Sequence, residues 1–221
     1  MIFLYDNQID DKTIVAKTCE TGFGVTNLQD FQLVKKWRSV GTSSEWVMID
    51  LGSTSIPIDY TAIAGHNFSA GATITVQASS SSGFSSPALS TALTHSTGII
   101  MQAVTATTKR YVRWKVDDTS NGDGYIEFGR GFVGLDLEVT AGAIPETEIG
   151  FVDTSVVKRS ITGQSFGDVG VIIQTFDNVS FPVISNTVRG QIETMFKDVK
   201  IVEPIFLDLY KDKSTDIKPL Y

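Results

Sequence analysis

The chain has little of the chemistry that cysteine and histidine provide. Its 221 residues include one cysteine, Cys19, and two histidines, His66 and His95. A single cysteine excludes an intrachain disulfide and is typical of a protein that folds in a reducing cytoplasm. A zinc site needs more nitrogen or sulfur ligands, and none is suitably spaced. The sequence therefore predicts neither a metal site nor a cofactor.

Basic runs and long apolar runs are also missing. The net charge is −7, and we interpret the largest basic cluster, Lys35-Lys36 with Arg38, as a solvated turn. Nucleic acid is therefore not expected as a partner. No apolar run reaches the length of a membrane span, and the acidic stretch 1–11 lacks the basic start of a signal peptide. No membrane insertion is expected.

Alternating apolar and polar residues predict strands over the first 140 positions. The stretch 72–79 (ATITVQAS) has the period of a strand with one wet face. The stretch 110–118 (RYVRWKVDD) places Trp114 on the same face as Val112 and Val116, so we expect Trp114 to be buried between two sheets. Because no long helical pattern intervenes, an antiparallel β-sandwich is the economical fold.

The turn after this strand reads TSNGDG (119–124), and such residues tolerate positive φ angles. The stretch 125–132 is expected to return as the partner strand. The stretch 135–140 alternates again, with Leu135, Leu137 and Val139 expected to face inward.

A change of pattern predicts a second unit after a linker at 141–152 that contains Pro145. Residues 153–221 are expected to form a small α+β module with strands at 155–161, 169–176 and 205–210. A helix is expected near 187–200, capped by Asn186 or Thr187. Its apolar stripe consists of Val188, Ile192, Met195, Phe196 and Val199.

Several stretches resemble the discoidin-like, or galactose-binding-like, jelly-roll domains. The most specific is the strand with Trp46 followed by Asp50, Leu51 and Gly52, and the second is the Tyr-Val-Arg-Trp strand at 111–114. The others are 27–39, 58–69, 72–79 and 126–134. The resemblance covers residues 20–140 and implies that residues 1–140 form a jelly-roll β-sandwich. Extracellular members often tie their ends with a disulfide, which this chain lacks.

The resembled fold implies that loops at one end of the sandwich hold any ligand. The residues that would form such a site are His66, Asn67, Trp37, Asp118, Asn121 and Asp123. A structural role for His66 and Asn67, closing a turn through local hydrogen bonds, is the favoured alternative. The acidic turn at 117–123 is likewise read as a hairpin turn more than as a Ca²⁺ site. We expect Trp37 to be the exposed tryptophan.

Enzymatic motifs are weak. The stretch 129–134 (GRGFVG) matches G-x-G-x-x-G, but a strand pattern and no helix follows it, so glycines at a bend are expected. Asp30, Glu45, Asp50 and Glu127 would be acid–base candidates only if the fold brought them together. We therefore predict no catalytic residues and no enzyme.

The whole chain is similar in style and order to phage and prophage virion proteins. The leading hypothesis is thus a virion structural protein of the tail or baseplate, folded in the host cytoplasm. It would contact other virion proteins and form a homo-oligomer or ring. The assembly contact is predicted to involve Val188, Ile192, Met195, Phe196 and Phe206. The alternative is a carbohydrate-binding module that contacts a host surface glycan.

Overall fold

A computed structural model describes residues 1–52, 56–139, 148–153, 156–159, 165–168, 172–177, 184–200, 203–208 and 217–220. As predicted, the protein is mainly β, with antiparallel strand pairing throughout these ranges. Within them, no helix combines the length and hydropathy that crossing a membrane requires.

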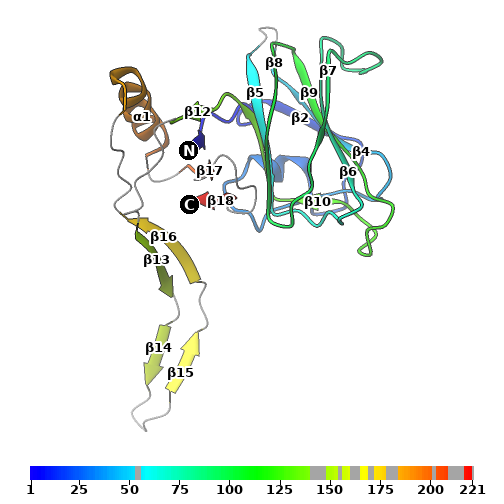
Figure 1. Ribbon diagram of the computed structural model, residues 1–221. Coiled ribbons are helices and arrows are strands. Elements are labelled where there is room, and N and C mark those ends of the chain that lie inside the picture. The colour runs from blue at the N-terminus through cyan, green and yellow to red at the C-terminus, as the bar shows by residue number, and fades with distance from the viewer. Residues whose placement is uncertain are drawn as a thin grey trace.

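Two sheets form the jelly-roll sandwich (Figure 1). The larger has the order β2-β4-β9-β6-β7 and the smaller the order β11-β5-β8. The strands of the larger sheet are β2 (Thr13–Ala16), β4 (Glu45–Asp50), β6 (Thr73–Ser79), β7 (Leu89–Leu93) and β9 (Tyr111–Asp117). Those of the smaller are β5 (Ile58–Ala64), β8 (Ile99–Thr107) and β11 (Arg130–Gly134). The predicted strands at 72–79 and 110–118 are thus confirmed.

The core lies between these sheets and is organised around Trp114. Val112, Trp114 and Val116 of β9 are all buried, as their alternation predicted. The indole Nε1 of Trp114 donates a 2.8 Å hydrogen bond across the sandwich to Oγ1 of Thr61 on β5. Gly131 on β11 leaves room for the indole, because a Cβ at this position would lie 2.3 Å from the ring. Gly129 and Gly134 likewise allow close approach of the Leu33 and Asp6 carbonyl oxygens, so these three glycines serve packing.

The predicted pairing of 125–132 with 110–118 is wrong. Strand β9 already has β4 and β6 as its two neighbours, so neither of its edges is open. Residues 125–132 instead supply β10 (Glu127–Phe128), which pairs with β3 (Trp37–Arg38), and most of β11, which pairs with β5. A period-two pattern identifies a strand but not its neighbour.

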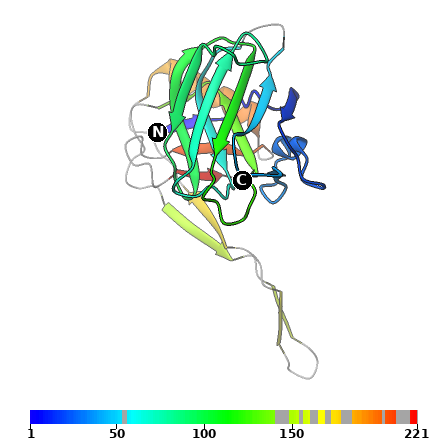
Figure 2. The same cartoon turned by 90° about the vertical axis from the view of Figure 1, so that its right-hand side faces the viewer.

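A third sheet joins the two ends of the chain (Figure 2). Its order is β12 (Leu137–Glu138), β1 (Ile2–Leu4), β17 (Ile205–Asp208) and β18 (Ile217–Leu220). The expected strand at 205–210 is therefore present but pairs with the first strand of the chain. Leu137 and Val139 are buried as expected, whereas Leu135 is 44% exposed because it precedes β12. The C-terminal elements are thus built onto the N-terminal strand.

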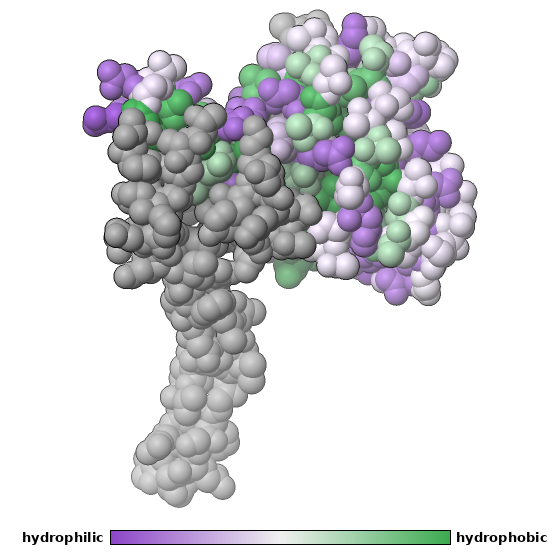
Figure 3. All heavy atoms as spheres, viewed as in Figure 1, coloured by the Kyte–Doolittle hydropathy of each residue, from purple (hydrophilic) through white to green (hydrophobic). Residues whose placement is uncertain are grey.

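Helix α1 (Asn186–Val199) covers this sheet, and Figure 3 shows hydrophilic side chains along its outer side. Its N-cap is Ser185, which precedes both predicted caps, and the Ser185 side chain accepts a hydrogen bond from the Val188 backbone N–H. Met195 and Val199 are buried, whereas Phe196 is 63% exposed, which corrects its place in the predicted stripe. Met195 and Val199, four residues apart, point in nearly the same direction, whereas Phe196 is rotated about 100° from Met195 and lies at the edge of the stripe.

The predicted assembly residues have different surroundings within the chain. Val188 and Ile192 are partly buried against the cluster that contains Met195, and Phe206 is buried against β5 and β11 residues. Among the five, Phe196 alone presents a largely exposed side chain. The contact with another subunit stays a prediction.

A two-stranded ribbon stands away from the rest of the molecule (Figure 1). Strand β13 (Glu148–Asp153) pairs with β16 (Ile172–Asp177), and β14 (Val156–Arg159) pairs with β15 (Ser165–Asp168). Residues 148–152 therefore form a strand where the sequence predicted a linker, while residues 141–147 lie outside the described ranges. The expected strands at 155–161 and 169–176 correspond to β14 and β16.

Candidate functional site

The structure brings together five of the six residues that were predicted to bind a ligand. Asn67 lies at their centre, three residues after the end of β5. Its Nδ2 donates 3.0 Å hydrogen bonds to Oδ2 of Asp123 and to the carbonyl of Tyr125, and its Oδ1 accepts from the Glu127 N–H. Asn121 Nδ2 donates to the Asn67 carbonyl. The amide of Asn67 thus joins two loops.

Asp118 is buried, and its side chain connects the same two loops. Its carboxylate accepts hydrogen bonds from the N–H of Ser69 at 2.7 Å and from Nδ2 of Asn121 at 3.2 Å. Burial alone would raise the pKa of Asp118, but the hydrogen bonds from Ser69, Asn121 and Ser120 outweigh it and hold the pKa below its usual range. An ionised Asp118 is therefore part of the internal network.

His66 contributes a neutral ring. It stacks on Phe68 with the ring centroids 4.4 Å apart, and its Nδ1 accepts a 3.2 Å hydrogen bond from the Phe68 N–H. Burial first, and then the neighbouring charge of His95, lower the pKa of His66 to about 4. A neutral imidazole that caps its own turn supports the structural interpretation of His66 and Asn67.

Trp37 does not join this group, and its expected exposure is wrong. It is 1% exposed, its Nε1 donates a 3.0 Å hydrogen bond to the Thr18 carbonyl, and its ring packs edge-on to Phe128 at 5.3 Å. Because β3 pairs with β10, alternate residues of this strand point inward and outward, and Arg38 takes the outward position. Trp37 is therefore a core residue.

The hydrogen bonds of Asn67 give a first prediction. Replacing Asn67 with alanine should lower the free energy of unfolding by about 2–3 kcal/mol, since it leaves partly buried partners unpaired. Replacing Asp123, which is exposed, with alanine should have a much smaller effect. Urea denaturation of both variants measures the difference. Equal stability of N67A and the parent protein would contradict the structural role.

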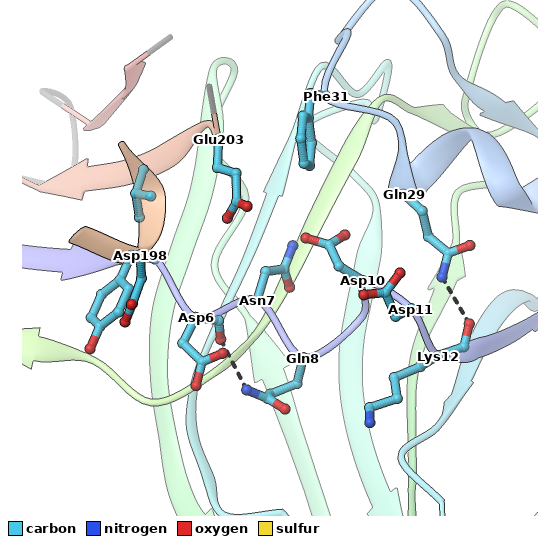
Figure 4. Close-up of a pocket in the computed structure, with 12 residues that line it drawn as sticks. Asp6, Asn7, Gln8, Asp10, Asp11, Lys12, Gln29, Phe31, Asp198 and Glu203 are labelled. Atoms are coloured by element: carbon cyan, nitrogen blue, oxygen red, sulfur yellow. Dashed lines mark hydrogen bonds between the residues drawn. The ribbon is translucent and has the colours of Figure 1, made fainter. Parts of the chain in front are cut away.

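A cleft elsewhere on the molecule was not predicted from the sequence (Figure 4). It has a volume of about 850 Å³ and lies between the sandwich and the C-terminal segment. Its lining residues are Tyr5, Asp6, Asn7, Gln8, Asp10, Asp11, Lys12, Gln29, Phe31, Asp198, Val199 and Glu203. Its volume is within the usual range of ligand pockets, and its lining is more polar than is usual for them.

Two amide side chains hold the segment 7–12 that forms one wall. Asn7 Nδ2 donates a 2.9 Å hydrogen bond to the Gly131 carbonyl, and its Oδ1 accepts from the Val133 N–H. Gln29, in the 3₁₀ helix η1 (Val25–Gln29), donates 2.8 Å hydrogen bonds to the carbonyls of Ile9 and Lys12. The wall is thus fixed to β11 and to η1.

A buried arginine positions the acid at the centre of this wall. Both terminal nitrogens of Arg130, which is 4% exposed, donate to the carboxylate of Asp10 at 2.8 and 2.6 Å. Burial raises the pKa of Asp10, although the hydrogen bond and charge of Arg130 act in the opposite direction. The Arg130 guanidinium also lies 5.3 Å from the centroid of the Phe31 ring. Asp10 and Phe31 are therefore oriented by the same residue.

The opposite wall comes from the C-terminal segment, through Asp198 at the end of α1 and Glu203 before β17. Figure 4 shows the side chains of Glu203, Phe31 and Asp10 pointing into the same space. Burial and the charges of Asp6 and Asp198 raise the pKa of Tyr5, which lies at the same end of the cleft. The cleft is therefore strongly acidic and includes an exposed aromatic ring.

Sequence patterns did not reveal this cleft, and its acids are not grouped as metal ligands are. The acids at 6–11 are visible in the sequence but lie far along the chain from Asp198 and Glu203, so no local motif joins them. Among the described residues, no three histidine, cysteine or acidic side chains are arranged to hold a metal ion. The carboxylates surround a space and do not converge on one point.

No protein-family model matches the chain, and no curated protein matches it. Solved structures similar to the sandwich include a chitosan-binding module of a chitosanase/glucanase from Paenibacillus sp. IK-5, at 25% identity and a TM-score of 0.46. This similarity covers 57% of the present chain and 97% of the module. A Streptococcus pneumoniae fucose-binding module is 11% identical with a TM-score of 0.47, over 58% and 94% of the two chains. Similarity at this level leaves the ligand to be argued from this chain's own residues.

Proposed function

We propose that the protein is a non-catalytic carbohydrate-binding protein that holds a short glycan in the acidic cleft. The observation that carries this proposal is the lining of the cleft, where carboxylates and amides surround an exposed Phe31. Carboxylate and amide groups hydrogen-bond to sugar hydroxyls, and an aromatic face packs on the apolar face of a sugar ring. The lining therefore has both kinds of contact that a glycan requires.

The wall at 7–12 also supports recognition because it is already ordered. Asn7, Gln29 and Arg130 fix its backbone and the carboxylate of Asp10 through hydrogen bonds inside the protein. A site whose groups are held before the ligand arrives loses less conformational freedom on binding.

The same hydrogen bonds favour binding over hydrolysis. A glycoside hydrolase needs one carboxylic acid that donates a proton to the leaving oxygen. Burial raises the pKa of Asp10, but both of its oxygens accept hydrogen bonds from Arg130, so neither is free to carry a proton toward a ligand. These hydrogen bonds exclude Asp10 as the proton donor. Incubation with a glycan that binds is expected to release no shorter products.

Titration calorimetry with a panel of neutral, amino and acidic oligosaccharides tests the proposal. A member of the panel should bind saturably, and Phe31→Ala should weaken its affinity about tenfold. The matched control is Phe196→Ala, which removes another exposed aromatic ring outside the cleft. Saturable binding that Phe31→Ala leaves unchanged would move the site to the loop end near Asn67, and no binding at all would reject the proposal.

A second candidate function is assembly within a phage tail or baseplate, and the ribbon favours it. Figure 2 shows this ribbon leaving the body of the molecule, and its strands pair only with one another among the described elements. Two-stranded ribbons are marginally stable alone, and their open edges are templates for pairing between chains. A virion neighbour or a second copy would supply the missing contacts.

The ribbon is separable from the body because Glu148 pairs with Asp177 at its base. Excision of 148–177 with a short Gly-Ser link preserves β17, which truncation at residue 150 would remove from the third sheet. Light scattering should show a smaller assembly for the excised variant if the ribbon is the contact. Glycan binding should survive, since none of the described ribbon residues lines the cleft.

A further inference from the structure

We infer that the ligand of the cleft carries free amino groups, so that the preferred glycan is an oligosaccharide of unacetylated amino sugars. The inference rests on the proposed function, because it assigns the chemical class of the glycan at that site. Three features carry it: the excess of carboxylates, their spacing, and the exposed aromatic ring among them.

The first feature is an excess of negative charge on both walls. Among the residues that the structure describes, five carboxylates line the cleft, against Lys12 in the lining and Arg130 behind Asp10. Arg130 is engaged by Asp10, which leaves Asp6, Asp11, Asp198 and Glu203 without a salt bridge within the described part of the chain. Walls of like charge attract a cation and repel an acidic sugar.

The second feature is that these carboxylates are spread around the cleft and do not form one cluster. The described residues contain no group of three acids, histidines or cysteines close enough to hold a metal ion. The cleft has a volume of about 850 Å³ and receives Asp198 and Glu203 from one wall and Asp6, Asp10 and Asp11 from the other. An extended ligand with several separate cationic groups matches this spacing better than a single ion does.

The third feature is the exposed ring of Phe31, which favours an amino sugar over a simple polyamine as the ligand. Phe31 is 37% exposed, and its ring points into the space between Asp10 and Glu203. A pyranose ring offers an apolar face to such a side chain, while its ammonium groups donate charge-assisted hydrogen bonds to the carboxylates. Both kinds of contact are met by one ligand.

A matched pair of ligands tests the inference on the full-length protein. The β-1,4-linked glucosamine trimer and the N-acetylglucosamine trimer share ring size and linkage but differ in charge. The glucosamine trimer should bind about tenfold more tightly at mildly acidic pH, where its amino groups are protonated, because each ammonium forms a charge-assisted hydrogen bond. Its affinity should fall as salt is added, whereas that of the acetylated trimer should change little.

Carboxylate variants locate the effect. Asp198→Asn and Glu203→Gln should each reduce the affinity for the glucosamine trimer about tenfold. The control is Glu193→Gln, which removes one charge from the same helix at a position outside the cleft. Spermidine, a polyamine without a sugar ring, should bind more weakly than the trimer and should be insensitive to Phe31→Ala.

The outcomes distinguish the two proposals. Equal or tighter binding of the acetylated trimer would overturn the amino-group inference and leave glycan binding in place. Failure of both trimers and of every other glycan would overturn the proposed function. If E193Q weakens binding as much as D198N does, the attraction comes from the overall charge of the protein, and the inference is overturned. Saturable binding of Ca²⁺ that D198N abolishes would also overturn it, in favour of a metal ion.

Discussion

Replacing Trp114 with alanine is expected to lower the free energy of unfolding by about 3–5 kcal/mol. The indole is 1% exposed and lies between the sheets, with its ring plane nearly perpendicular to that of Phe128 at 5.8 Å. Gly131 on the opposite sheet has no side chain that could fill the vacated space. The cavity would therefore remain, and its cost adds to the lost burial. Urea denaturation followed by circular dichroism measures the change.

Two further variants test separately the indole hydrogen bond and the close packing of the indole on Gly131. Thr61→Val removes the acceptor of the indole hydrogen bond and should cost about 1–2 kcal/mol, because the Nε1 donor is then buried without a partner. Gly131→Ala should also be destabilising, since its new methyl group would overlap the ring. A W114A variant as stable as the parent would mean that the sheets pack differently from the strand pairing described above.

Replacing Arg130 with methionine is expected to cost about 3 kcal/mol of stability at neutral pH. The arginine is 4% exposed, and its removal leaves the Asp10 carboxylate without its cationic partner. The expected loss lies at the lower end of the usual range because the Asp10 side chain keeps 30% exposure and stays partly hydrated. The control is Lys35→Met, which breaks an exposed pair with Asp30 and should leave the denaturation midpoint nearly unchanged.

The pH dependence of this loss identifies its cause. Arg130 acts to lower the pKa of Asp10, against burial, so its removal should raise that pKa further above the value in the unfolded chain. A raised carboxyl pKa means that the folded state binds the proton more tightly, so acidification stabilises the variant relative to neutral pH. The difference between R130M and the parent protein should therefore shrink as the pH falls. A loss that is the same at neutral and acidic pH would indicate packing alone.

Arg130→Met should also weaken binding in the cleft. Asp10 would lose the two hydrogen bonds that orient it, and Phe31 would lose the guanidinium beside its ring. Glycan affinity and stability would then fall together in this variant, whereas Glu203→Gln should lower affinity alone. Comparing the two variants distinguishes affinity lost because the wall at 7–12 is disordered from affinity lost because a direct contact with the ligand is removed.

The local pattern of the sequence determined much of the fold. Period-two alternation located β6 and β9 and placed Trp114 in the core, because the faces of a strand are fixed by the residues along it. The helical period located α1 in the same way, and the Asn/Asp/Gly turn correctly followed β9. These features depend on the pattern of residues within a few positions of one another, and that pattern can be seen in a single sequence.

Only the tertiary structure decided which strands pair and which surfaces form a site. Trp37 is buried because β10 pairs with β3, and that pairing was not visible in either stretch. The cleft exists because β1 pairs with β17, which brings the end of α1 beside the acids that follow β1. Asp10 and Arg130 likewise form an ion pair although they lie 120 positions apart in the chain. Charge in a sequence shows its sign and its amount, but the position of a charged surface depends on contacts between residues far apart in the chain.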